Sequence, residues 1–98
     1  MVTRIVKMTF RKGEEENFLA VFNKYKSRIR AADGCTFLEL LSDIHSHNVF
    51  FTNSRWHSES YLHKYRDSEV FKELWPIVKA LFEKPAEAWT IELVEVME

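Results

Sequence analysis

The stretch "FFTNSRWHSESYLHKYRDSEVF" (Phe50–Phe71) decides how the rest of the chain is interpreted. It begins as an aromatic, β-type run and changes to helical spacing after Trp56. Ser58 is a candidate N-cap with Glu59 in the first turn, and Ser68 is a candidate N-cap for a second helix. The stretch therefore predicts a strand that leads into two consecutive helices.

The flanking sequence predicts a β-α-β-β-α-β order, with the second helical region split in two. An amphipathic helix is predicted between the glutamates at Glu14–Glu16 and the turn at Gly34. Strands are predicted at Val2–Phe10, Cys35–Asp43, Asn48–Trp56 and Trp89–Met97. This order indicates an α+β, ferredoxin-like fold, an antiparallel sheet with helices on one face, formed as a single domain over residues 1–98.

The predicted sheet is apolar on both of its faces. In the second strand, Phe37 and Leu41 alternate with Leu38 and Leu40. A sheet that is apolar on both faces has to be covered on both, and the chain has too few helices to do this alone. We therefore expect a homodimer that packs sheet against sheet.

The composition and charge of the chain limit the kinds of partner and the location that we expect for it. The formal net charge is −1, with 14 basic and 15 acidic residues, so no general attraction to nucleic acid or anionic membrane is expected. No apolar run reaches the ~18 residues of a membrane span, and none resembles a signal peptide, so a cytoplasmic location is expected. Cys35 is the only cysteine, which excludes an internal disulfide, and a structural role is expected for it.

The opening stretch resembles the antibiotic biosynthesis monooxygenase-like (ABM) domain family, whose members end a strand in Trp and place characteristic residues at fixed intervals after it. The residues here at those positions are Trp56, Leu62, Tyr65, Ser68 and Phe71. "DGC" (Asp33–Cys35), before the second strand, is also similar to the family pattern, and the resemblance extends over about Val2 to Val94.

The resemblance implies a homodimeric α+β barrel with a pocket between sheet and helices. Some members are cofactor-independent oxygenases of quinols and phenols, others degrade haem, and others isomerise or bind metabolites. In the oxygenases the ionised substrate donates an electron to oxygen, so the protein supplies a dry pocket, a group that holds the anion, and a base. Trp75 stands where the haem-degrading branch has its axial His, and Val6–Lys7 stand where that branch has an Asn. Neither haem nor another cofactor is therefore expected.

The same resemblance suggests site residues. The catalytic candidates are Asn53, Tyr65 and Arg55, and the candidate pocket walls are Trp56, Phe71 and Trp75. Asn53 and Arg55 share one side of their strand with Phe51, and this side could face the pocket, a partner subunit or solvent. Tyr65 can donate a hydrogen bond but is a poor base at neutral pH, so a His or water would have to accept the substrate proton.

A metal site is not predicted. Asp43, His45 and His47 form an Asp-x-His-x-His pattern in the link between two strands, where alternate residues can point one way. No further ligand is evident, so the expected metal content is none.

The resemblance thus implies a cofactor-independent monooxygenase of a small aromatic or quinol-like substrate. Two alternatives stay open: a non-catalytic dimeric module that binds small molecules or serves in stress responses, and a metabolite isomerase on the same fold.

Overall fold

The computed structural model describes residues 1–98 and confirms the β-α-β-β-α-β order. None of its helices is long and apolar enough to cross a membrane. The elements are β1 (Val2–Thr9), α1 (Glu15–Arg30), β2 (Cys35–Ser42), β3 (Val49–Trp56), α2 (Glu59–Arg66), α3 (Glu69–Lys79) and β4 (Glu87–Ile91).

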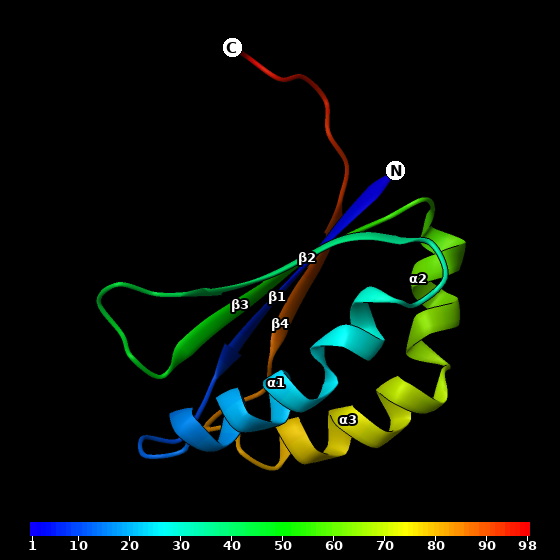
Figure 1. Ribbon diagram of the computed structural model, residues 1–98. Coiled ribbons are helices and arrows are strands. Elements are labelled where there is room, and N and C mark those ends of the chain that lie inside the picture. The colour runs from blue at the N-terminus through cyan, green and yellow to red at the C-terminus, as the bar shows by residue number, and fades with distance from the viewer.

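The strands form one antiparallel sheet in the order β2-β3-β1-β4, with all helices on one face (Figure 1). This is the expected ferredoxin-like arrangement. Strand alternation divides the residues into an inner face, toward the helices, and an outer face. On the two central strands, the inner face carries Val2, Arg4, Val6, Met8, Phe50, Thr52, Ser54 and Trp56, and the outer face carries Thr3, Ile5, Lys7, Phe51, Asn53 and Arg55.

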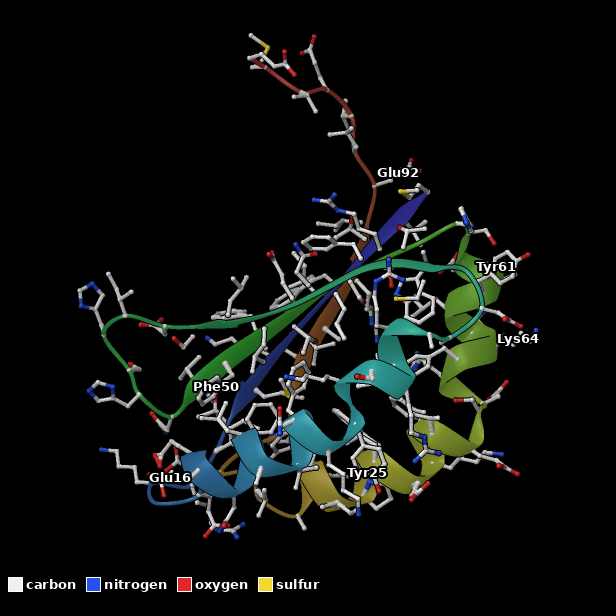
Figure 2. All side chains as sticks on the ribbon, viewed as in Figure 1. Glu16, Tyr25, Phe50, Tyr61, Lys64 and Glu92 are labelled. Carbon is white, nitrogen blue, oxygen red and sulfur yellow. The ribbon has the colours of Figure 1, made fainter.

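The larger core cluster joins the inner face to α1 and α3. Its buried members are Met8, Phe10, Phe18, Tyr25, Ile29, Phe50, Leu74 and Val78. The Phe10 and Phe18 rings stack with centroids 4.3 Å apart. Phe50 lies between the sheet and α1, and Tyr25 lies beside α3 (Figure 2), where its hydroxyl donates to Glu73 Oε1 at 3.0 Å. Apolar packing, this hydrogen bond and an ion pair between Arg28 and Glu73 therefore hold the two long helices together.

A smaller cluster at the other end of the sheet positions α2. It consists of Cys35, Trp56 and Leu62, all buried. Beside it, Gly34 adopts φ +80°, and a Cβ added there would lie 2.4 Å from Cγ of Tyr61. Only glycine allows both this backbone conformation and the close approach of α2. The α1–β2 turn thus fixes the position of the first turn of α2.

The last strand is shorter than the sequence predicted. Instead of Trp89–Met97, β4 spans Glu87–Ile91, because its register with β1 ends at the pair Ile91–Thr3. From Glu92, labelled in Figure 2, the chain leaves the sheet and extends away from the helices (Figure 1). Its apolar side chains are exposed, Val94 to 95%.

Candidate functional site

A cavity of about 440 Å³ lies between the inner face and the helices. Of its 19 lining residues, 15 are hydrophobic, which makes it an environment for an apolar molecule rather than for a hydrated ion. β1 and β3 supply one wall through inner-face residues such as Val6 and Thr52, and the helices supply the opposite wall. The pocket expected between sheet and helices is therefore present as a volume in the structure.

Four of the residues predicted for the site form a continuous aromatic wall in this cavity. Trp56 and Tyr65 stack with ring centroids 5.0 Å apart, Tyr65 meets the edge of Phe71 at 5.4 Å, and Phe71 stacks on Trp75 at 5.5 Å. All four line the cavity. The strand end and two helices bring them together, because Tyr65, Phe71 and Trp75 lie on the helix faces turned toward the sheet. Such a wall can stack against a flat ring system.

Tyr65 adds a polar group to this wall. Burial raises the pKa of its phenol above the ordinary value, so the hydroxyl stays protonated at neutral pH. Tyr65 contributes its backbone carbonyl to Ser68, but none of the side-chain hydrogen bonds of the protein uses its hydroxyl. The hydroxyl therefore has no hydrogen-bond partner within the chain and is not a base at neutral pH.

Beside Tyr65, a hydrogen bond fixes the indole of Trp56. Trp56 is 1% exposed, and its Nε1–H donates to Ser54 Oγ at 2.9 Å. Both residues lie on the inner face and line the cavity. The bond satisfies a buried donor and locks the ring against rotation, so the cavity wall is rigid at this point.

Two arginines are among the few polar residues that line the cavity. Arg4 lies on the inner face of β1 and its Nη1–H donates to Thr90 Oγ1 at 2.8 Å. Arg66 is the last residue of α2 and is exposed, so it reaches the cavity from the solvent side. Burial, and secondarily the charge of Arg66, lower the pKa of Arg4 from its ordinary value.

The structure contradicts the placement of Asn53 and Arg55 in the pocket. Both lie on the outer face, where Asn53 Nδ2 donates to Glu39 Oε1 at 2.9 Å and the Arg55 guanidinium lies 4.4 Å from the centroid of the Phe37 ring. The physical reason is strand alternation, because burial of Trp56 on the inner face turns both residues the other way. They are therefore not candidates for substrate contact in this cavity.

Histidine, cysteine and acidic side chains are absent from the cavity wall. None of the four histidines lines it, and neither does any Asp or Glu. Cys35 is buried beside Trp56, and burial raises the pKa of its thiol, which disfavours the nucleophilic thiolate. No group of three or more His, Cys, Asp or Glu side chains is arranged to hold a metal ion.

The inference from sequence missed Arg4, Arg66, Thr52 and Ser54 as cavity residues. A signal for Arg4 was present, because it shares a strand side with Val2, Val6 and Met8, and a charge on an otherwise apolar strand face is uncommon. Arg66 gave no such signal, since basic residues are ordinary in the last turn of a helix.

The fold and the cavity define a ferredoxin-like α+β protein with an aromatic-walled pocket between its sheet and its helices. The family model described as antibiotic biosynthesis monooxygenase matches residues 1–75. The chain therefore belongs to the antibiotic biosynthesis monooxygenase (ABM) family, as the spacing after Trp56 indicated.

Solved structures support the fold assignment. An antibiotic biosynthesis monooxygenase superposes with a TM-score of 0.91 at 17% identity, covering 97% of this chain and 100% of that chain. Rv0793 from Mycobacterium tuberculosis gives 0.88 at 18% identity, covering 99% and 98%. PA3566 from Pseudomonas aeruginosa gives 0.85 at 20% identity, covering 96% and 94%. At these identities the similarity shows the fold alone. No curated protein sequence matches the chain.

Proposed function

We propose that the protein is a cofactor-independent monooxygenase that oxidises a small aromatic or quinol-like substrate in this cavity. The main support for the proposal is the continuous aromatic wall from Trp56 to Trp75. This wall includes Tyr65, whose hydroxyl has no hydrogen-bond partner within the chain. A cavity of about 440 Å³ is of the size that holds small-molecule ligands. Membership of the ABM family supports the same class of reaction.

The residues suggest a simple mechanism. The aromatic wall stacks on the substrate rings and keeps water away, so the substrate meets oxygen in a medium of low polarity. Tyr65 donates a hydrogen bond to the substrate oxygen and stabilises it as it becomes anionic. The anion reduces molecular oxygen, and an activated CH2 group becomes a carbonyl while the second oxygen atom leaves as water. Both electron pairs needed come from the substrate, and its acidic proton leaves to water.

A non-catalytic binding module is the second candidate. The observation that favours it is the absence of His, Asp and Glu from the cavity wall, which leaves no side chain to act as a base near neutral pH. In that case the cavity binds the same kind of molecule and releases it unchanged.

The two candidates are separated by oxygen uptake measured with a panel of anthrones and quinols. We expect Tyr65→Phe to lower kcat/KM roughly tenfold or more, the loss typical of one hydrogen bond to a charged group. Tyr61→Phe is the matched control, because Tyr61 lies on the same helix but outside the cavity wall. Uptake with no member of the panel, together with tight ligand binding, would favour the binding module over the enzyme.

We also propose that a second copy of the chain covers the outer face. Leu41, Trp89 and Ile91 on this face are 45–46% exposed, and the buried Oδ1 of Asn53 has no hydrogen-bond partner within the chain. The segment beyond β4 extends away from the helices and leaves the apolar side chains of Leu93, Val94, Val96 and Met97 exposed (Figure 1). The resemblance to a dimeric family supports this assembly.

Light scattering tests the assembly. The protein is expected to be a dimer at micromolar concentration, and Trp89→Asp is expected to dissociate it, because a carboxylate would be buried between apolar faces. Lys12→Asp, in the exposed turn before α1, is the control for a new surface charge. A monomeric native protein would contradict the proposal.

A further inference from the structure

Arg4 and Arg66 bring two positive charges to the same apolar cavity without an acidic partner. The five ion pairs of the protein involve other residues, namely Lys7–Glu87, Arg11–Glu14, Arg28–Glu73, His63–Glu59 and Lys64–Asp33. The only side-chain hydrogen bond of the two arginines is the one from Arg4 to the neutral hydroxyl of Thr90. Both charges are therefore uncompensated within the chain.

Such an arrangement is unfavourable when the cavity is empty. Arg4 is half-buried, and the remaining lining of the cavity is apolar or neutral. Two like charges repel, and an apolar wall strengthens the repulsion because it screens charge less than water does. The lowered pKa of Arg4 reflects this burial and the charge of Arg66. An anion placed between the two guanidinium groups would remove the repulsion and gain charge-assisted hydrogen bonds.

We propose that the ligand of the cavity is an aromatic carboxylate, with the carboxylate held by Arg4 and Arg66 and the rings stacked on the wall from Trp56 to Trp75. A guanidinium can donate two parallel hydrogen bonds to a carboxylate, so two guanidinium groups fit one such anion. The inference rests on the cavity described under the proposed function and narrows its ligand class, but it does not depend on catalysis.

A matched pair of probes tests the inference directly. 1-Naphthoate and 1-naphthamide share the same rings and nearly the same size, but only the first is charged at neutral pH. Their Kd values are measured by calorimetry and by quenching of tryptophan fluorescence, since Trp56 and Trp75 line the cavity. We expect naphthoate to bind roughly tenfold or more tightly, the ratio typical of hydrogen bonds to a charged group.

Substitutions of the two arginines test whether they cause the preference for naphthoate over naphthamide. Arg66→Gln is expected to remove most of the preference for naphthoate without affecting naphthamide, and Arg66→Lys to retain part of it. Arg4→Gln should act in the same direction, with circular dichroism as a check that it folds. Lys12→Gln removes one positive charge outside the cavity wall and is expected to change neither Kd.

The possible outcomes are distinct. Equal affinity for the two probes overturns the anion proposal while leaving the apolar cavity and the oxygenase proposal intact. A preference that survives Arg66→Gln and Arg4→Gln overturns the assignment to these residues. If the variants instead weaken the dimer and leave both Kd values unchanged, the arginines bind an acidic group of the second copy, and the proposal is wrong. Failure of both probes to bind counts against any aromatic ligand, and oxygen uptake then tests the enzyme separately.

Discussion

The contact between Gly34 and Tyr61 allows a quantitative test of how α2 is held. An added Cβ would lie 2.4 Å from Cγ and 2.6 Å from Cβ of Tyr61, and Cβ cannot move without the helix backbone. Alanine at φ +80° costs about 1–2 kcal/mol, and forcing atoms into a packed contact costs about 1–3 kcal/mol more. We expect Gly34→Ala to lower the free energy of unfolding by about 2–5 kcal/mol.

Gly13 provides the matched control. Its φ of +97° is also positive, but nothing lies within 4 Å of an added Cβ. Gly13→Ala should therefore show only the backbone cost of about 1–2 kcal/mol. In a Tyr61→Ala background the contacts with the ring carbons are gone while the contact with Cβ remains, so the additional loss from Gly34→Ala should shrink but stay above the Gly13→Ala value.

Urea denaturation followed by tryptophan fluorescence measures all these free energies. The reasoning is refuted if Gly34→Ala is no more destabilising than Gly13→Ala, or if Tyr61→Ala fails to reduce its effect. Because α2 carries Tyr65 and Arg66 to the cavity, folded Gly34→Ala protein should also bind naphthoate more weakly.

Three further predictions follow from single contacts. Ser54→Ala leaves the buried Nε1–H of Trp56 without an acceptor and should cost about 1–3 kcal/mol in urea denaturation; an unchanged midpoint would mean that water replaces the hydroxyl. Lys64 lowers the pKa of Asp33 through a 2.7 Å hydrogen bond and through its charge. The stability that this pair adds to the fold is therefore fully present above about pH 3.8, the ordinary pKa of an Asp, and is lost as the pH falls through the lowered pKa. Carboxyl NMR titration should show this pKa rising in Lys64→Gln, and no rise would exclude the pair in solution. Pro76→Ala supplies the missing N–H inside α3. It should raise the free energy of unfolding by about 1–2 kcal/mol, after subtracting the stability that proline gives by restricting the unfolded chain, and should therefore raise the melting temperature. A lower melting temperature would contradict this.

The fold could be predicted because local pattern and global arrangement agree. The strand ending at Trp56 and the helix after Ser68 are each read from residue spacing, and Ser68 does accept a hydrogen bond from the backbone N–H of Phe71 as its N-cap. The aromatic wall follows from the same spacing, since helical periodicity places Tyr65 and Phe71 on faces that meet the sheet.

The direction of Asn53 and Arg55 could not be predicted, because β3 gives no alternating signal. Phe50 and Phe51 are both aromatic, and the following residues up to Arg55 are all polar, so a period of two fits either face equally well. The tertiary packing of Trp56 decides between them. The cavity arginines were missed for another reason: Arg4 and Arg66 are 62 positions apart in the sequence, and only the β1–β3 pairing brings their elements together.

Strand β3 carries two separate chemical surfaces in alternate positions. Thr52, Ser54 and Trp56 face the cavity, whereas Phe51, Asn53 and Arg55 face the opposite side of the same sheet. For protein engineering this means that a combinatorial library at Thr52 can explore ligand selectivity while the opposite surface keeps its native sequence. A second library at Phe51 and Asn53 can change the outer face, which is the proposed dimer surface, while the cavity keeps its native lining. One short strand thus encodes two traits that can be varied, and selected, independently.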